Sequence, residues 1–290
     1  MKRLLPYALL AYSFTLHAEQ DPTIEISASY NNVERAKIKK PSSQRHHHLS
    51  YRQGFVLGTY KHKLKSDSEL QFGVGYMQTM FDFSHHTKKT SFKQKHFDNL
   101  LLQFDASTNE IENWKWDAGL GLQINTDNFS LSRYTFFNGV IHGTVDYTEY
   151  SHLHVGVLGF SGMHYTRLLP IIGFDWKIND TWKLNAVFPV DMALVYSIND
   201  NWSIDASIRY MLSRQRLNHN SYNSRGLVAY RNWGAEAGIN YAFNDSFRIN
   251  LHVGNAFAGR MRISNQSDSK RKHLELDSSL YYGASASISF

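Results

Sequence analysis

The last eleven residues of the chain alternate strictly between two kinds of side chain. The first set is mostly apolar and ends the chain on an aromatic residue: Leu280, Tyr282, Ala284, Ala286, Ile288 and Phe290. The residues between them are mostly small or polar: Tyr281, Gly283, Ser285, Ser287 and Ser289. A β-strand turns successive side chains to opposite faces. The same alternation recurs in residues 114–125, 202–212 and 247–254, so it predicts a β-sheet with one apolar face.

The N-terminal segment has the pattern of a secretory signal peptide. Lys2 and Arg3 precede an apolar run over residues 4–16, and Ala18 stands directly before Glu19. We therefore predict that residues 1–18 are removed and that residues 19–290 form the mature protein. No other stretch approaches the roughly 20 apolar residues that a transmembrane helix needs, so a mature chain within a membrane would have to cross it with strands.

Composition leaves two all-β classes open. Hydrophobic residues make up 42% of the chain, and its mean hydropathy is −0.43. A membrane barrel can be this polar because half of each strand faces its lumen, but a secreted soluble β-sandwich could have the same composition. The absence of cysteine excludes a disulfide scaffold and a thiolate metal site. A net charge of +6 favours anionic partners such as lipid headgroups.

A repeated turn motif favours the membrane barrel. An apolar residue, Asn-Asp, one variable residue and an aromatic residue occur in residues 178–182, 198–202 and 243–247, which predicts tight hairpins. Five of the six tryptophans lie close to a tight turn: Trp114, Trp116, Trp176, Trp182 and Trp202. Amphipathic rings belong at a membrane interface, so we interpret these residues as an aromatic girdle at one rim. A soluble sandwich would scatter or bury them.

Together these features resemble the outer-membrane β-barrels of Gram-negative bacteria. The resemblance rests on the signal peptide, the alternating strands, the tight turns, the Phe188-Pro189 element and the terminal Phe290. It implies an all-β, transmembrane, antiparallel up-and-down barrel in the outer membrane, whose terminal aromatic residue is read by the barrel assembly machinery. One departure is Ser285, which stands where that assembly signal usually has glycine.

The alternating segments predict about twelve strands. They cover residues 23–30, 51–64, 70–83, 97–106, 114–125, a segment ending at 178, 182–188, 192–198, 202–212, 227–242, 247–258 and 274–290. Residues 127–178 allow either one strand with a long loop or three strands, so fourteen strands is the alternative. Longer polar connections are predicted at residues 31–50, 84–95, 127–149, 213–226 and 260–273. Because barrels have short periplasmic turns and long outer loops, the tight turns should face the periplasm.

Charged and polar residues on the inward face are the best candidates for a functional site. The predicted lumen-lining residues are Lys115, Asp117, Asp175, Lys177, Lys183, Asp205, Arg209, Glu236, Arg248 and His252. They could line an aqueous passage or pair with one another and help to plug it. Our first hypothesis is an outer-membrane channel for small solutes, with anionic solutes as a candidate class. In it Lys183, Arg209 and Arg248 set the charge preference. The alternative is a non-conducting structural or surface-interaction barrel whose basic loops bind lipopolysaccharide.

Other chemistry has weaker support. His46, His47 and His48 are contiguous, and His152 and His154 share one face of a predicted strand, but we expect no acidic or thiolate ligand to be positioned beside them. We therefore expect no metal site and no cofactor. Residues 218–226, around Ser221, superficially resemble the His-x-Ser-Asn-Gly signature of outer-membrane phospholipases. Tyr222 follows that serine, however, so a lipid hydrolase is only a second alternative, and we assign no catalytic residue. No nucleic-acid partner is expected.

Overall fold

The computed structural model describes residues 23–64, 68–84, 92, 94–111, 113–126, 135–163, 165–218, 225–244, 246–267 and 271–290. The predicted signal peptide lies outside these residues. Among the described helical residues, no helix has the length and apolar character needed to cross a membrane.

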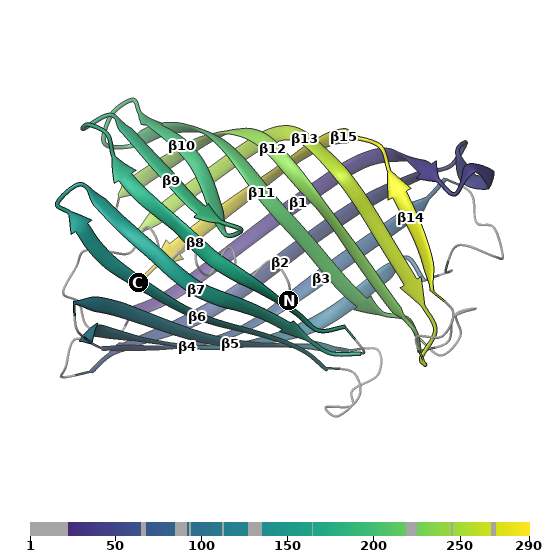
Figure 1. Cartoon of the computed structure of the whole chain (residues 1–290), viewed down its shortest axis with the longest axis horizontal. Coiled ribbons are helices and arrows are strands. Elements are labelled where there is room, and N and C mark those ends of the chain that lie inside the picture. Colours follow the sequence, from purple (N-terminus) through teal and green to yellow (C-terminus); the bar gives the residue numbers. More distant parts are fainter. Residues whose placement is uncertain are drawn as a thin grey trace.

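The described chain consists of β-strands and one short 3-10 turn, η1 (Ser42–Gln44). The strands are β1 (Thr23–Lys40), β2 (His48–Lys63), β3 (Glu69–Phe83), β4 (His96–Ile111), β5 (Trp114–Asn125), β6 (Thr135–Thr148), β7 (Ser151–Ser161), β8 (Arg167–Lys177), β9 (Trp182–Phe188), β10 (Asp191–Ser197), β11 (Trp202–Arg216), β12 (Leu227–Asn244), β13 (Phe247–Ser264), β14 (Lys272–Leu276) and β15 (Ser279–Ser289). Figure 1 shows them as one set of tilted, neighbouring strands.

The strands close into a barrel with fourteen positions. Each strand from β1 to β13 pairs antiparallel with the next along the chain, and β15 pairs with both β13 and β1. Since β14 also lies between β13 and β1, β14 and β15 together form one interrupted wall strand. The expectation of twelve strands is therefore wrong and the alternative of fourteen is correct, because residues 127–178 contain the three strands β6, β7 and β8.

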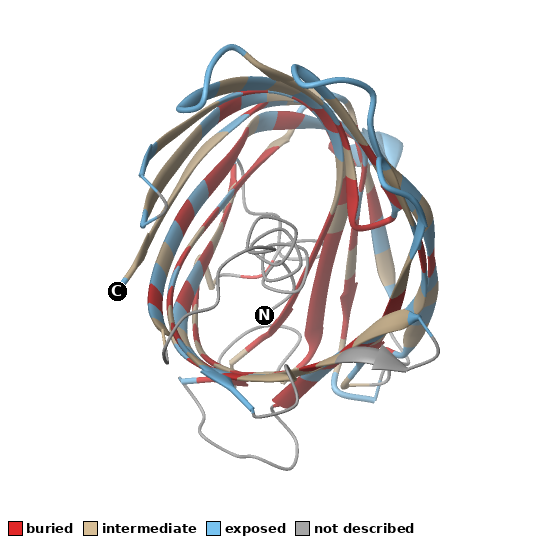
Figure 2. Ribbon diagram, turned by 90° about the vertical axis from the view of Figure 1, so that its left-hand side faces the viewer, coloured by how far each residue is buried: buried red, intermediate tan, exposed pale blue. Residues whose placement is uncertain are grey.

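The two faces of the wall follow the period-two pattern of the sequence. Outward positions carry large apolar side chains that are about half exposed, such as Val56 at 51%, Val74 at 45% and Leu120 at 50%. The positions between them point inward and are mostly buried, as at Gln53 and Gln123. Figure 2 looks into the ring of strands, along which buried and exposed residues alternate. An apolar outer face and a polar inner face are the arrangement expected of a membrane barrel.

Several strands continue into segments predicted as loops. β1 extends to Lys40, β11 to Arg216 and β13 to Ser264, while β6 occupies most of the connection predicted for residues 127–149. In each case a neighbouring strand supplies backbone hydrogen bonds, as where β11 pairs with β12 up to Arg216 and Leu227. Local side-chain polarity therefore underestimates strand length, because ladder pairing does not depend on an apolar face.

The wall is interrupted beside one short hairpin. β9 and β10 have seven residues each, whereas β11 has 15. In the described pairings, β10 reaches β11 only as far as Ile208, and β9 reaches β8 only from Ile172 onward. Figure 1 shows the β9–β10 hairpin ending part-way along the barrel, so that β8 and β11 continue without a strand between them. Pro189 stands at its tip, as proline does where strands end.

Candidate functional site

The loop-side half of the lumen is occupied by part of the barrel's own wall. We call residues 211–218 and 225–232, the outer ends of β11 and β12, the lumenal hairpin. Residues on both faces of this hairpin are buried, including Leu212, Arg214 and Gln215 on β11 and Val228 and Tyr230 on β12. A wall strand that separates lipid from lumen would have one exposed face. Burial of both faces therefore means that the hairpin bends into the lumen on the side where β10 has ended, while its β12 arm stays paired with β13 from Leu227 to Arg231.

One face of the lumenal hairpin bonds to the inner wall formed by β3, β4 and β5. The Gln215 side-chain amide donates from Nε2 to Thr79 Oγ1 at 2.9 Å, and its Oε1 accepts from Asn99 Nδ2 at 3.0 Å. Gln123 Nε2 donates to Asn99 Oδ1 at 2.9 Å. The side chains of Thr79, Asn99, Gln123 and Gln215 are all 0% exposed. They therefore form a buried polar layer across the lumen.

The opposite face bonds to the inner wall formed by β6 and β7. The Arg214 guanidinium donates to the backbone oxygens of Ser161 and Phe137, at 2.9 and 3.0 Å, and to Asn138 Oδ1 at 2.8 Å. The rings of Phe136, Phe160 and Tyr165 lie 5.0–5.6 Å from its central carbon. Since Phe136 and Phe160 are buried on the inward side of their strands, Arg214 reaches the inside of the wall.

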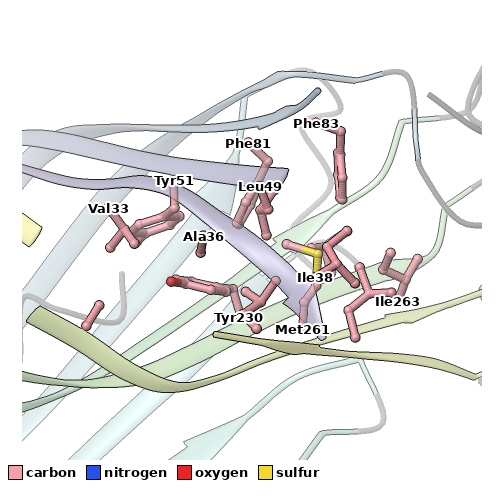
Figure 3. Packing of buried hydrophobic residues seen from close by; sticks show 14 of the residues in the cluster. Val33, Ala36, Ile38, Leu49, Tyr51, Phe81, Phe83, Tyr230, Met261 and Ile263 are labelled. Atoms are coloured by element: carbon pink, nitrogen blue, oxygen red, sulfur yellow. The ribbon is translucent and has the colours of Figure 1, made fainter. Parts of the chain in front are cut away.

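An apolar cluster completes the closure of this half. The Tyr230 ring on the hairpin lies 4.6 Å from Tyr51 and 5.9 Å from Phe81, which project from β2 and β3. Figure 3 shows Tyr230, Met261 and Ile263 in one packed cluster with Ile38, Leu49 and Phe81. The loop-side half is therefore packed like a protein core.

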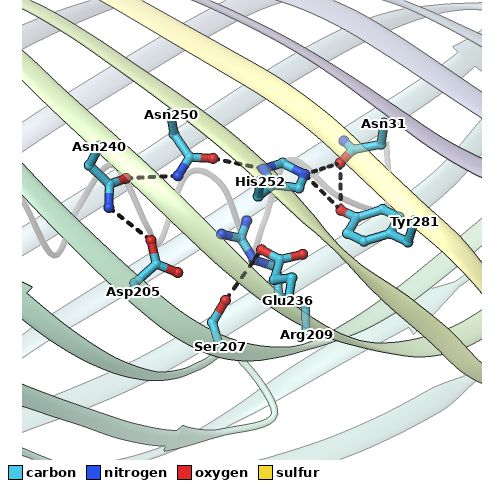
Figure 4. A network of polar contacts seen from close by, with 9 residues as sticks. All are labelled: Asn31, Asp205, Ser207, Arg209, Glu236, Asn240, Asn250, His252 and Tyr281. Carbon is cyan, nitrogen blue, oxygen red and sulfur yellow. Dashed lines mark hydrogen bonds and ion pairs between the residues drawn. The ribbon is translucent and has the colours of Figure 1, made fainter.

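The turn-side half is lined by polar side chains in a connected network (Figure 4). Asp205 accepts from Asn240, Asn240 accepts from Asn250, and Asn250 Oδ1 lies 2.7 Å from His252 Nδ1. His252 Nε2 lies 3.1 Å from the Tyr281 hydroxyl and 3.2 Å from Asn31 Oδ1. The network runs from β11 through β12, β13 and β15 to β1, and so it crosses the seam where the barrel closes.

Beside this network, a buried ion pair joins neighbouring strands. Arg209 Nε lies 2.5 Å from Glu236 Oε1, and the Glu236 side chain is fully buried. Ser207 Oγ also donates to the Glu236 carboxylate, at 3.3 Å. The charge of Arg209 is therefore neutralised within the wall.

A second polar cluster lies on β5 to β8, also near the turns. His142 Nε2 and His154 Nδ1 are 3.1 Å apart, and the two rings are parallel within 3°. Asp117 lies beyond His142, with 3.7 Å from Oδ2 to Nδ1, and Asp175 lies beyond His154, with 3.4 Å from Oδ2 to Nε2. Residue by residue, the order across four strands is carboxylate, imidazole, imidazole and carboxylate.

The structure distributes the predicted lumen-lining residues over three environments. Asp117, Glu236 and His252 are buried, and six others are partly buried: Lys115, Asp175, Lys183, Asp205, Arg209 and Arg248. Lys177 instead lies at the rim, where it pairs with Asp180 of the adjacent turn at 2.8 Å. This ammonium group holds the pKa of the exposed Asp180 carboxyl below its usual value, mainly through their hydrogen bond.

Outer features of the sequence are placed as follows. Trp176, Trp182 and Trp202 are 38–45% exposed, Trp114 stacks with Trp116 at 5.9 Å, and all five tryptophans stand near the turn ends of their strands. The backbone of Phe290 pairs with Ile24 of β1.

Among the basic loop residues, Lys39, Lys40 and Lys95 pair with acidic side chains. Ser221 of the hydrolase hypothesis lies outside the described residues. Contact with membrane and assembly machinery stays a prediction.

Sequence reasoning missed the lumenal hairpin and half of the histidine cluster. Arg214 and Gln215 fall in residues 213–226, which were interpreted as a loop because polar side chains follow one another there. His142 falls in residues 127–149, also interpreted as a loop. The pattern Ile141-His142-Gly143-Thr144-Val145 alternates and could have indicated a strand. Partners across the lumen could not have been found from local patterns.

Comparison with known proteins places the chain in a family. Residues 111–287 match the family model described as "Domain of unknown function (DUF6268)". The chain belongs to this family. Its matched part begins at the end of β4 and includes both the histidine cluster and the lumenal hairpin, so these features lie within the DUF6268 region.

The similar proteins agree with the barrel. An uncharacterized protein of Chlamydia pneumoniae is 25% identical over 275 residues, which are 90% of this chain and 85% of that protein. An uncharacterized protein of Chlamydia trachomatis is 23% identical over 202 residues, covering 69% and 64%. The crystal structure of an outer membrane channel from Pseudomonas putida F1 superposes with a TM-score of 0.51 at 9% identity, covering 94% and 97%. This chain therefore has the fold of an outer-membrane β-barrel.

Proposed function

We propose that the protein is an outer-membrane channel for small polar solutes and that the lumenal hairpin holds it closed. The carrying observation is that a polar lumen on the turn side ends at a hairpin made from the barrel's own wall. An inert barrel could fill its interior with fixed side chains. Here the closing element is a β-hairpin beside an interrupted wall, and it could return to the gap next to β10. Displacing it would join the two ends of the lumen.

The described charges argue against a strong preference for anions. Arg209, one of the three cations on which that preference would depend, is paired with Glu236. The acidic groups Asp117, Asp175 and Asp205 point into the same half. We therefore propose neutral polar or weakly cationic solutes.

Single-channel recording in planar bilayers tests the proposal. We expect the wild-type protein to be closed for most of the time at low voltage, with occasional conductance steps. Arg214→Ala removes the three hydrogen bonds of the guanidinium and should raise the open probability at least about tenfold, which corresponds to only 1.4 kcal/mol. The exposed Arg260→Ala is the matched control and should behave like the wild type.

One result would contradict the channel and another its closure by the hairpin. The first is the absence of conductance steps from folded wild-type protein and from both Arg214→Ala and Gln215→Ala, which would favour the non-conducting barrel. The second is an equal open probability in Arg214→Ala and Arg260→Ala, which would remove the gating role of the hairpin. Retention of the heat-modifiable band in gels shows that each variant has folded.

Binding of lipopolysaccharide by the basic loops has less support. Three of the described loop cations already have acidic partners, namely Lys39 with Asp277, Lys40 with Glu275 and Lys95 with Asp82. Surface ion pairs of this kind are weak, so they do not prevent such contact, but they reduce the free positive charge that would favour it.

A further inference from the structure

We propose that His142 and His154 form a two-imidazole site for a divalent transition-metal ion such as Zn²⁺ or Cu²⁺ in the turn-side lumen. The proposal does not depend on whether the barrel conducts. It starts from the strand register. Asp117 pairs with His142 across β5 and β6, and His142 pairs with Gly156 across β6 and β7. Because Gly156 has no side chain, the imidazole of His154, two residues away, can approach that of His142.

The close approach of the neighbouring backbone also requires glycine at position 156. A Cβ atom at position 156 would lie 2.3 Å from the backbone oxygen of Ile141 and 2.9 Å from the Cα of His142. Backbone atoms at such distances cannot move aside as a flexible side chain could. The approach of the two imidazoles is therefore built into the backbone at this place.

One arrangement of hydrogens on the two imidazoles opens a position for a cation between them. Each imidazole has one nitrogen directed at a carboxylate and one directed at the other ring. A neutral imidazole carries a hydrogen on only one nitrogen. If His142 Nδ1 and His154 Nε2 carry the hydrogens that face Asp117 and Asp175, two lone pairs meet at 3.1 Å. Lone pairs at this separation repel each other unless a proton or a metal ion lies between them.

The geometry at that position suits a transition metal. Zinc binds imidazole nitrogen at about 2.0–2.1 Å, and a tetrahedral angle places two such nitrogens roughly 3.3 Å apart. The observed separation of 3.1 Å needs little adjustment. Metal-bound histidines usually donate their other N–H to a carboxylate. Asp117 and Asp175 stand 3.7 and 3.4 Å from those nitrogens, close by although neither pair forms a hydrogen bond. Thr144 Oγ1, 3.2 Å from His154 Nδ1, adds an oxygen at the same place.

The site would be open rather than closed. Within the described residues, no group of three or more His, Cys, Asp and Glu side chains is placed to share one ion. The remaining coordination positions would therefore be filled by water or by a donor atom of a solute. Imidazole ligands favour Zn²⁺, Cu²⁺ and Ni²⁺ over Ca²⁺ and Mg²⁺. The sequence expectation of no acidic partner near His154 is wrong, because folding brings Asp175 beside it.

Zinc titration of the folded, untagged full-length barrel tests the proposal. The starting protein carries His46→Ala, His47→Ala and His48→Ala, so that this contiguous histidine triplet does not contribute. We expect calorimetry to detect one equivalent of Zn²⁺, which is lost in His142→Ala and in His154→Ala. His252→Ala, another buried lumenal histidine, is the matched control and should retain it. Asp117→Asn and Asp175→Asn should each weaken binding about 10–100-fold.

Electron paramagnetic resonance with one equivalent of Cu²⁺ gives an independent readout. We expect hyperfine structure from two imidazole nitrogens, reduced to one in either histidine variant. His142→Gln and His154→Gln replace the alanine variants if those do not fold. The proposal is overturned if the starting protein binds no Zn²⁺, which would mean that the imidazoles share only a proton. It is equally overturned if binding persists in both histidine variants.

Discussion

The two halves of the lumen are built from the same strands, but their inward polar side chains have different kinds of partners. On the turn side, inward residues such as His252 and Asp205 form networks along the wall. On the loop side, Arg214 and Gln215 find their partners on the opposite walls. The difference begins where β11 loses a neighbour, since β10 pairs with it only as far as Ile208.

The interrupted wall explains where the change occurs. β11 remains an ordinary wall strand from Trp202 to Ile208, where β10 pairs with it. Beyond Ile208 its described pairing is with β12 alone, and both of its faces become buried within three residues. The stability of the loop-side half should therefore depend on packing, and that of the turn-side half on hydrogen bonds and charge.

The largest expected effect comes from the apolar packing. Phe81 is 1% exposed and has aromatic neighbours on two walls. Phe81→Ala should lower the free energy of unfolding by about 3–5 kcal/mol, because it leaves a cavity as well as losing buried area. Phe72→Ala, on the outward face of the same strand and 51% exposed, should cost about 2 kcal/mol. Urea titration in lipid vesicles measures both, and equal costs would contradict a packed plug.

The next effect concerns Arg214 itself. Arg214→Leu keeps an apolar side chain among the three rings but leaves Ser161 O, Phe137 O and Asn138 Oδ1 without this donor. The expected cost is about 2–3 kcal/mol by the same titration, as for hydrogen bonds to a charged group. Arg260→Leu, at an exposed position of β13, should change stability little. Greater stability of Arg214→Leu than of the wild type would show that burying the charge of Arg214 destabilises the barrel more than its hydrogen bonds stabilise it.

A smaller effect is expected in the turn-side half. Glu236→Gln removes the carboxylate that pairs with Arg209 and should cost about 1.5 kcal/mol. It should also shift the reversal potential in a salt gradient toward anion preference, since Arg209 then faces the lumen unneutralised. Asp82→Asn breaks the half-exposed pair with Lys95 and should cost about 0–1 kcal/mol. An unchanged reversal potential in Glu236→Gln would place Arg209 outside the solute path.

The smallest effect is expected outside the lumen. Asn199 Oδ1 accepts from the backbone N–H groups of Asn201 and Trp202, at 3.0 and 2.9 Å. Asn199→Ala should therefore cost about 1 kcal/mol and leave conductance unchanged. Asp200→Ala in the same turn is the control. A change in open probability in Asn199→Ala would mean that the conformation of this turn is coupled to that of the lumenal hairpin.

Local patterns predicted the wall well. The alternation around Trp114 and Trp182 gave β5 and β9 with the bounds that the structure has, and the Asn-Asp motifs gave the tight turns. These features depend on residues close in sequence, since an asparagine bonds to its own turn and a strand face is set by alternate positions. The girdle and the assembly signal stay predictions.

The rest depends on contacts that sequence spacing does not reveal. Ser213 to Arg216 look like a loop because four polar residues in a row have no apolar face, and their partners Thr79, Asn99 and Phe136 are distant in the chain. β6 and β7 were ambiguous because Gly139, Gly143, Gly156 and Gly159 dilute the apolar alternation. His142 and His154 lie close together because Gly156 has no side chain between them. This approach can be recognised only from the register between the strands.

The seam between β1 and β15 has a consequence for biogenesis. The first and last wall strands hydrogen-bond to each other along nine residue pairs, from Glu25 and Ser289 to Val33 and Tyr281. Until both have arrived, every partly assembled form has two unsatisfied strand edges, which are templates for pairing with other chains. Ring closure is thus the step of longest sequence separation, and it removes both exposed strand edges at once.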